Sequence, residues 1–483
     1  MHFRNFSPYL FTLILSFGFT LNVLGQSPSL KEKIDHYLQT RSTNTNIPGF
    51  SVAIVHDDVV LLSKGYGQTS EGNPVTEKTP FAIASLSKGF TAMSVLQLVD
   101  SGLINLDKPI THYISNLKIN DSRADLITVR QILNQTSGFS DKTFPELTFT
   151  HQPSSLNESL SSWTAAVLTD NPGTKFHYHN PNYQLLALLV ETVSKQKFGD
   201  YLQQHILVPL KMSNTYDFAN TAAFYSQLPE GHIYVSGVPL AMKDPEWFID
   251  GAAGIVSTAD DMAHWLALHN NQGNFQGTQL LSEEGLTNMQ TRPPESVSPY
   301  GMGWFVNDDN WYHSGILWTY SAEEIIFIKE GYGIVLLFNG GISPYADYYS
   351  LLSGVIQIIH GEEGEVPSLP WWVLPLFVDA LFFLAVALAF RKIFRTRKWF
   401  EYYLRNQLWK TVLNFIARLI PLILVISIPF ILTAMSGRVL SSYRIFLMAP
   451  DIIAVLWIYA LLQLAIVGVR ITFVLRQSPT PQN

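Results

Sequence analysis

Short apolar runs separated by polar turns occupy two distant parts of the chain. Residues 50–66 contain an alternating run, a turn at 57–58 and a second apolar run. Residues 311–339 contain two further apolar runs that meet at a turn at 330–331. Runs of this length, rich in β-branched and aromatic residues and bounded by turn residues, predict strand pairs.

The segment between these strand pairs carries apolar residues at helical spacing. Residues 85–103, 182–195 and 258–268 each show this pattern, and Gly102 marks the end of the first. Ser257 or Thr258, with an acidic residue three positions later, resembles a helix N-cap. Strands at both ends with helices between them predict an α+β domain. Its antiparallel sheet would be built from both termini, flanked by helices, with a helical subdomain inserted.

The C-terminal part of the chain holds three long apolar stretches, at about residues 371–390, 415–435 and 450–469. Each is long enough to cross a bilayer, so residues 366–483 are predicted to form a membrane domain of three transmembrane helices. The loop after the first stretch is strongly basic. Because positively charged loops stay in the cytoplasm, the sequence predicts a protein of the cytoplasmic membrane with a cytoplasmic C-terminus. Everything before the first stretch would then be extracytoplasmic.

The N-terminus supports the same orientation. Arg4 precedes an apolar run over residues 9–24, and small residues end at Gly25. This pattern predicts a secretory signal peptide over residues 1–25, although an uncleaved anchor is the alternative. Residues 26–365 would then form the extracytoplasmic domain.

Two ionisable residues interrupt the apolar stretches. Asp379 lies near the middle of the first stretch, and Arg418 lies within the second. Charges in hydrocarbon are costly, so we expect these two side chains to pair with each other, or Arg418 to reach the inner surface. A transport role is the less favoured alternative.

Composition narrows the chemistry. The net charge of −7 gives no indication of a nucleic-acid partner. The chain has no cysteine, which excludes disulfides, a cysteine nucleophile and cysteine-ligated zinc. The sequence therefore predicts neither a metal nor a cofactor, and it leaves the oligomeric state open.

The most suggestive motif is Ser85-Leu-Ser-Lys88. If Ser85 opens a helix, Lys88 lies one turn later on the same face, where a partly buried amine can act as the base for the hydroxyl. The positive end of the helix would favour the developing oxyanion. Ser194 and Lys197 have the same spacing, but they follow a helical stretch and are predicted to be a solvated helix end.

Two further motifs could complete a site. Tyr178-His179-Asn180 precedes a predicted helix, where a phenol and an amide could point into a cleft and move protons. His313-Ser314-Gly315 precedes the last strands, where His313 could face the Ser–Lys pair with a donor and Gly315 could let substrate approach. The alternative for the loop pair His177 and His179, a metal site, lacks a third ligand nearby.

The order Ser-x-x-Lys, Tyr-x-Asn, His-x-Gly resembles the class C β-lactamase and penicillin-binding-protein superfamily of serine hydrolases. Other stretches agree, and the likeness covers roughly residues 30–345; they begin at Gln135 (QTSGF), Ala253 (AGIVSTADD) and Tyr300 (YGMGW). The resemblance implies a β-lactamase/transpeptidase-like fold with the site between sheet and helical subdomain. It implies that Ser85 is acylated, that Lys88 is the base for this step, and that Tyr178 transfers protons. It also implies that Asn180 holds the substrate amide and that His313 stands where relatives have Lys or His. The N–H groups of Ser85 and Ile316 would form the oxyanion hole.

The combination of signal peptide, hydrolase domain and three spans also resembles membrane-anchored peptidases that remove an N-acyl-D-amino-acid prodrug cap, such as the colibactin-maturation peptidase. This likeness implies a small peptide or amide substrate, with a D-amino acid residue as a candidate. Two alternatives stay open: a protein that senses or binds β-lactams or cell-wall peptides with little turnover, and an esterase.

Overall fold

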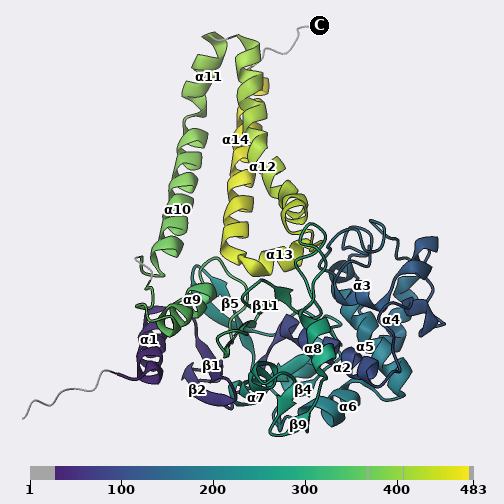
Figure 1. Cartoon of the computed structure of the whole chain (residues 1–483). Coiled ribbons are helices and arrows are strands. Elements are labelled where there is room, and N and C mark those ends of the chain that lie inside the picture. Colours follow the sequence, from purple (N-terminus) through teal and green to yellow (C-terminus); the bar gives the residue numbers. More distant parts are fainter. Residues whose placement is uncertain (1–27, 367–368, 406, 478–483) are drawn as a thin grey trace, which may run out of the picture.

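The computed structural model describes residues 28–366, 369–405 and 407–477. A rounded α+β domain lies at one end, and a bundle of long helices rises from it (Figure 1). The predicted signal peptide lies outside the described residues.

The core of the domain is a six-stranded antiparallel sheet. β1 from the N-terminal part pairs with β13 from the C-terminal part, with Phe50 opposite Phe338. This pairing confirms the prediction that one sheet is built from both ends of the domain. The strands, in sheet order, are β10 (Phe305–Val306), β11 (Trp311–Ile316), β12 (Ser321–Phe327), β13 (Tyr332–Phe338), β1 (Gly49–His56) and β2 (Val59–Gly67).

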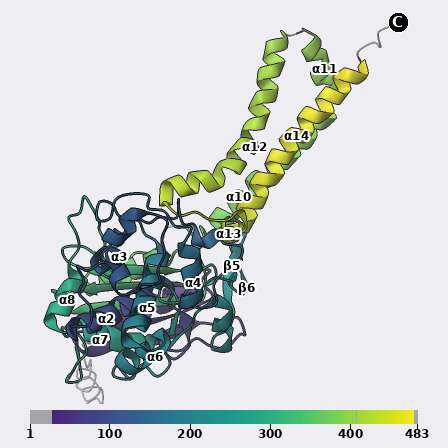
Figure 2. The same cartoon turned by 90° about the vertical axis from the view of Figure 1, so that its right-hand side faces the viewer.

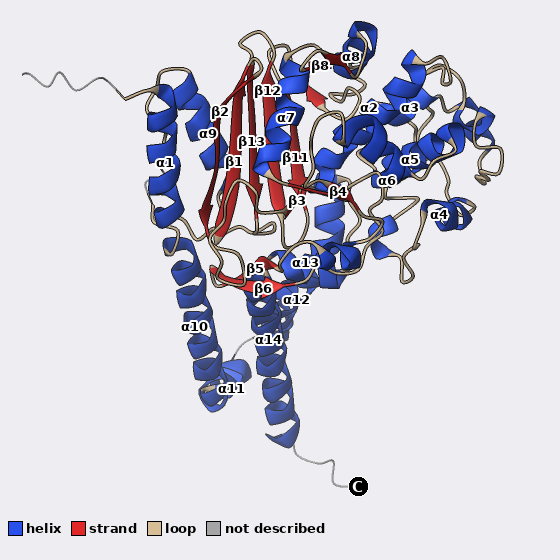
Figure 3. Ribbon diagram, turned by 90° about the horizontal axis from the view of Figure 1, so that it is seen from below, coloured by secondary structure: helices blue, strands red, loops and turns tan. Residues whose placement is uncertain are grey.

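Helices cover both faces of this sheet (Figure 3). Alternate residues of β1 point to opposite sides, which is the two-residue period of a strand. Val52 and Ile54 pack with α1 (Leu30–Asn44) and α9 (Tyr348–Ile359), whereas Ala53 and Val55 belong to the core that includes α2 (Ser87–Asp100) and α7 (Ala259–Asn270). The whole of β1 is therefore buried or nearly so.

A helical subdomain lies beside α2 and contains α3 (Val129–Leu133), α4 (Leu156–Trp163), α5 (Asn180–Ser194) and α6 (Phe198–Leu202). The three predicted helices correspond to α2, α5 and α7. The predicted cap is present, since Thr258 Oγ1 accepts the N–H of Asp261 at 3.2 Å. The remaining α-helix and strands of the domain are α8 (Glu283–Gln290), β3 (Phe81–Ala82), β4 (Tyr216–Asp217), β7 (Ile255–Ser257) and the hairpins β5 (Gly231–Val235)–β6 (Val238–Met242) and β8 (Asn274–Phe275)–β9 (Thr278–Gln279).

Three helices in the described part of the chain are long and apolar enough to cross a membrane: α10 (Val373–Phe394), α12 (Leu408–Ser436) and α14 (Pro450–Gln477). α12 and α14 contain the predicted spans 415–435 and 450–469 and extend beyond them, whereas α10 begins two residues after the start of the predicted span 371–390 and ends four residues beyond it. Part of the basic loop forms a further helix, α11 (Thr396–Arg405), which lies at the end of the bundle away from the domain (Figure 1).

The helix α12 bends before it reaches the domain (Figure 2). Pro421 and Pro429 lie inside it, and proline removes a helical hydrogen bond and kinks the axis. The helix ends at Gly437, whose φ of +71° is the left-handed conformation in which glycine commonly terminates a helix. The loop 437–441 and α13 (Ser442–Met448) then rest against the domain before α14 begins.

The predicted pairing of Asp379 with Arg418 is wrong. Asp379 Oδ1 accepts the hydroxyl of Ser236 at 3.2 Å, while Arg418 Nη1 donates to Gln463 Oε1 at 2.6 Å. The reason is that the β5–β6 hairpin reaches α10, where a Cβ on Gly237 would lie 2.5 Å from Pro375. Each charged side chain therefore finds a nearer polar partner.

Candidate active site

The chain reaches Ser85 through a tight, well-anchored turn. β3 leads into a 3₁₀ helix, η1 (Ala84–Leu86), which continues directly into α2. Ala84 has a φ of +51°, a conformation that costs a non-glycine residue about 1 kcal/mol or more. Ser87 holds the turn, because its hydroxyl donates to the Ala84 carbonyl at 2.6 Å and accepts the Ile255 N–H at 3.0 Å. Ser85 itself is half-buried and faces a cavity.

Lys88 meets Ser85 as the spacing predicts. Its Nζ lies 3.0 Å from Ser85 Oγ and donates to the Ala252 carbonyl at 2.7 Å, while the side chain is fully buried. Burial, reinforced by the positive charge of Arg438, holds the pKa of Lys88 well below its ordinary value. A neutral amine beside a hydroxyl is the arrangement that a Ser–Lys base requires. The role of Ala252 could not be predicted from the sequence, because a backbone carbonyl leaves no side-chain signal.

Tyr178 lies beside both Lys88 and Ser85. Lys88 Nζ is 4.9 Å from the centroid of the Tyr178 ring. Burial raises the pKa of Tyr178 to about 12, although a hydrogen bond with Ser85 and the charge of Arg438 oppose the shift. The phenol is therefore protonated at neutral pH and can serve as a proton donor.

Asn180 begins α5 and lines the same cavity. Its Nδ2 donates to Glu146 Oε1 at 3.0 Å, whereas its Oδ1 is buried without a hydrogen-bond partner among the described residues. A buried acceptor without a partner is costly unless a ligand satisfies it. The arrangement is thus suited to a substrate N–H.

The orientation of His313 differs from our expectation. Its ring accepts the Tyr300 hydroxyl at Nε2 (3.0 Å) and donates from Nδ1 to the Ser314 carbonyl (2.8 Å), so both nitrogens are occupied. Burial, together with the nearby Lys88, lowers the pKa of His313 to about 3 and keeps the ring neutral. The neighbouring residue Ser314 lines the cavity instead, and it was not among the predicted site residues.

The structure gives a reason for glycine at position 315 that differs from the approach of substrate that we inferred. A Cβ at this position would lie 2.3 Å from the Ile83 carbonyl oxygen, so glycine allows β11 to approach the segment that carries Ser85. Ile316 follows and lines the cavity with a side chain that is 48% exposed. Ser85 and Ile316 thus line the same cavity.

The cavity beside Ser85 has a volume of about 420 Å³, and most of its lining side chains are apolar. Tryptophan, leucine and isoleucine residues of the domain form one part of the wall. The other part comes from the C-terminal helices and the loop between them: Leu432, Ser436, Arg438, Leu440 and Met448. No pattern in the sequence predicted this second contribution.

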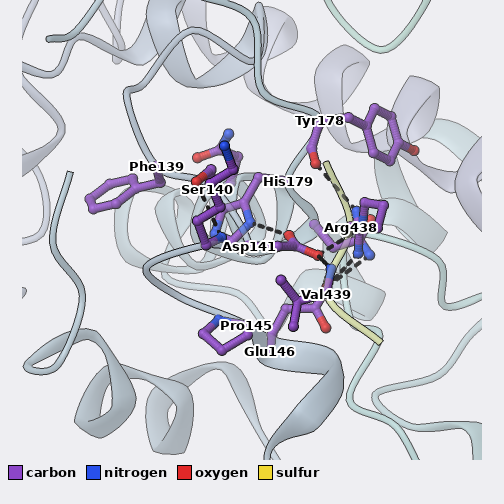
Figure 4. A network of polar contacts seen from close by, with 12 residues as sticks. Phe139, Ser140, Asp141, Pro145, Glu146, Tyr178, His179, Arg438 and Val439 are labelled. Atoms are coloured by element: carbon purple, nitrogen blue, oxygen red, sulfur yellow. Dashed lines mark hydrogen bonds and ion pairs between the residues drawn. The ribbon is translucent and has the colours of Figure 1, made fainter. Parts of the chain in front are cut away.

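Arg438 joins two buried carboxylates in what we call the Arg438 cluster, formed by Asp141, Glu146 and Arg438 (Figure 4). Its guanidinium contacts Asp141 Oδ2 and Glu146 Oε1, both at 2.9 Å. Burial alone would raise the pKa of Asp141, but Arg438 and His179 outweigh it and hold the pKa below its ordinary value. Burial raises the pKa of Glu146 to about 7 against the opposing charge of Arg438.

The histidine pair considered as a metal site and the second Ser-x-x-Lys sequence make ordinary structural contacts. His177 Nε2 lies 2.8 Å from Asp170, and Lys197 pairs with Glu191 at 3.7 Å beside the end of α5. Within the described ranges, no group of three or more histidine and acidic side chains could hold a metal ion. Ser194 donates to the Val190 carbonyl as an ordinary helix-end hydroxyl.

Comparisons with known proteins agree with this fold. Residues 34–350 match the sequence family described as Beta-lactamase. Protein flp of Staphylococcus aureus (strain MW2) is 30% identical over 317 residues, which are 64% of this chain and 63% of flp. The human protein "Putative beta-lactamase-like 1" is 28% identical over 363 residues, 71% of this chain and 67% of that protein. The chain thus matches less than two thirds of the length of flp.

Two solved structures are similar in fold. The octameric penicillin-binding protein homologue from Pyrococcus abyssi has a TM-score of 0.57 and 23% identity, covering 69% of this chain and 78% of that one. The crystal structure of SurE has a TM-score of 0.58 and 20% identity, covering 70% and 78%. Since the family match runs from residue 34 to residue 350, well over half of the sequence, this chain belongs to the Beta-lactamase family.

Proposed function

We propose that this protein is a membrane-anchored serine hydrolase that cleaves a small peptide or amide through an acyl-Ser85 intermediate. The observation that carries the proposal is the 3.0 Å separation of Lys88 Nζ and Ser85 Oγ, in a place where Lys88 is fully buried. An amine that burial keeps neutral can accept the hydroxyl proton, and serine needs such a base to become a nucleophile.

The proposed reaction has two halves. Ser85 Oγ attacks the carbonyl carbon while its proton passes to Lys88, and the oxyanion is held by the N–H groups of Ser85 and Ile316. Tyr178 gives its proton to the leaving nitrogen, the C–N bond breaks, and Lys88 reprotonates Tyr178. Water then attacks the carbonyl carbon of the acyl-Ser85 ester, and its proton passes to the pair formed by Tyr178 and Lys88. The C–O bond to Ser85 then breaks. Ser85 regains a proton, and the product leaves as a carboxylic acid.

The cavity suggests what surrounds the scissile bond. Its walls are mostly apolar, while the unpaired Oδ1 of Asn180 offers one acceptor. The best substrate is therefore an amide whose N–H meets Asn180 and whose neighbouring group is apolar. Because of the resemblance to prodrug-cap peptidases, amides of D-amino acids are the first compounds to test.

We further infer the arrangement in the membrane. Residues 1–25 form a signal peptide, residues 26–365 the extracytoplasmic catalytic domain, and residues 366–483 the membrane domain. The inference rests on the basic residues between the first two spans, which the positive-inside rule assigns to the cytoplasm. They are Arg391, Lys392, Arg395, Arg397, Lys398, Arg405 and Lys410.

Labelling with a fluorophosphonate probe tests the nucleophile. The full chain in detergent is expected to gain one adduct by intact mass, and the Ser85→Ala variant is expected to gain none. Ser194→Ala is the matched control, since it removes the serine of the other Ser-x-x-Lys sequence and should leave the adduct in place. A folded full chain that gains no adduct would contradict the enzyme proposal and favour a binding role. A positive result leads to a screen of D-amino-acyl amides, esters and β-lactams.

A further inference from the structure

Each residue of the segment 178–180 is held by the Arg438 cluster, and Figure 4 shows the contacts of Tyr178 and His179. The three contacts use one residue of the cluster each. They are Arg438 Nη1 to the Tyr178 carbonyl at 3.3 Å, Asp141 Oδ1 to His179 Nδ1 at 2.9 Å, and Glu146 Oε1 to Asn180 Nδ2 at 3.0 Å. The cluster therefore holds both Tyr178, which we assign to proton transfer, and Asn180, which we assign to amide binding.

The positive charge of this cluster comes from the loop 437–441, which joins α12 to α13. The loop is tied down a second time, because the N–H of Val439 donates to Asp141 Oδ2 at 3.1 Å. The side chains of Asp141 and Glu146 are 0% and 4% exposed, so without the guanidinium the cluster would hold two buried carboxyl groups with no cation. Such groups must take up a proton or rearrange.

Arg438 also lies close to the reacting groups themselves. The centre of its guanidinium is 5.8 Å from the centroid of the Tyr178 ring, and its side chain lines the cavity. The same ring lies 4.9 Å from Lys88 Nζ. A displacement of the Tyr178 backbone would therefore change both the proton path and the surroundings of the base.

We propose that Arg438 is a positioning residue for Tyr178 and Asn180, so that the active site is complete only when the loop between the second and third apolar helices is docked on the catalytic domain. This proposal rests on the proposed function, and it assigns to the C-terminal helices a role beyond anchoring. The guanidinium suits the task because its planar fork can bind two carboxylates and a carbonyl at once.

The test measures the rate of fluorophosphonate labelling of Ser85 against pH, with the full chain in detergent. Arg438→Ala is expected to label about 100-fold more slowly, because a displacement of about 1 Å in catalytic geometry has an effect of this size. Loss of the positive charge should also move the midpoint of the pH profile upward, toward the ordinary pKa of lysine. Arg438→Lys should restore the midpoint in part but not the rate, since a compact ammonium lacks the planar fork with which Arg438 reaches both carboxylates and the carbonyl.

Two controls separate positioning from folding. Arg123→Ala removes another guanidinium that binds a carboxylate (Asp121, 2.6 Å) and a backbone carbonyl (Leu168, 2.9 Å) away from the cavity, and it should leave rate and midpoint unchanged. Arg438→Ala/Glu146→Gln removes one buried acid together with the cation. It should regain thermal stability relative to Arg438→Ala without regaining the labelling rate. If Arg438→Ala does not fold, Arg438→Lys and the double variant decide by the same criteria.

The outcomes are distinct for the two proposals. A full chain that labels at Ser85, with Arg438 variants that label at the same rate and pH midpoint, would overturn the positioning role alone. Arg438 variants that lose only thermal stability would overturn it as well. A folded full chain that takes up no probe would overturn the proposed function and this proposal with it.

Discussion

At the scale of single residues, the most informative side chain is Lys88, which is fully buried and whose described hydrogen bonds go to a hydroxyl and a carbonyl rather than to a carboxylate. Burial without a counter-ion favours the neutral amine, and it does so by lowering the pKa of Lys88 in the folded state. The base would then be available at a pH where an exposed lysine is still protonated.

We therefore expect the labelling rate of Ser85 to rise with pH as Lys88 loses its proton, with a midpoint below the ordinary lysine pKa of about 10.4. Lys88→Arg should abolish this limb and lower the rate roughly 10²- to 10⁴-fold, since a guanidinium does not give up its proton. Lys197→Arg, in the other Ser-x-x-Lys sequence, is the matched control. A flat wild-type profile between about pH 6 and 9 would count against an amine base.

The residues near β11 show how far sequence reasoning extends at this scale. A strand period of two implies that His313 and Gly315 face one side while Ser314 and Ile316 face the other. It does not say which side meets the cavity. In the structure, Ser314 and Ile316 line the cavity, whereas the ring of His313 accepts a hydrogen bond from Tyr300, which lies in a loop with no periodic pattern. The proximity of Ser85 and Lys88 was predictable, because residues three positions apart on a helix lie on the same face.

At the scale of elements, α2, which carries Lys88, packs closely against the loop before β10. Gly303, in the stretch that begins at Tyr300, has a φ of +90°, and a Cβ there would lie 2.8 Å from Gly89 Cα and 3.0 Å from the Lys88 carbonyl oxygen. Both atoms belong to the first turns of α2. Any side chain at this position must therefore push the helix that carries Lys88.

Gly303→Ala and Gly72→Ala form a matched pair that isolates this contact. Gly72 has a similar φ of +82° but nothing within 4 Å of its added Cβ. Each alanine should cost about 1–2 kcal/mol for the left-handed backbone, and Gly303→Ala should cost about 1–3 kcal/mol more through overpacking. The thermal unfolding midpoint in detergent and the labelling rate of Ser85 report the two effects. Equal losses of stability in the two variants, with unchanged labelling in both, would mean that the contact with α2 is unimportant.

The order of elements was largely predictable, because each depends on local periodicity. The strand pairs, α5, α7 and the apolar helices all appear where the apolar pattern indicates them. The contacts of the β5–β6 hairpin with α10 and of the loop 437–441 with Asp141 were not predictable. Each joins residues more than 140 positions apart through one or two polar side chains, and no repeating pattern in the sequence announces such a contact.

At the scale of the whole molecule, the α+β domain and the basic helix α11 lie at opposite ends of the apolar bundle (Figure 1). If the bundle crosses a bilayer, these two parts must lie on different sides of it. The loop 437–441 lies on the side of the domain, which its contact with Asp141 requires. The orientation of the bundle in the membrane therefore decides on which side the cavity, Arg438 and the basic helix α11 each lie.

The absence of cysteine from the natural sequence makes this orientation directly measurable. Asp308→Cys replaces a domain side chain that is 95% exposed, and Lys398→Cys replaces an exposed side chain on α11. In intact cells, a membrane-impermeant maleimide should label the Asp308→Cys variant and should reach the Lys398→Cys variant only after permeabilisation. The unaltered chain, with no thiol, is the control for background. The reverse labelling pattern would place the domain in the cytoplasm and would remove the basis for an extracytoplasmic substrate, while leaving the Ser85–Lys88 chemistry intact.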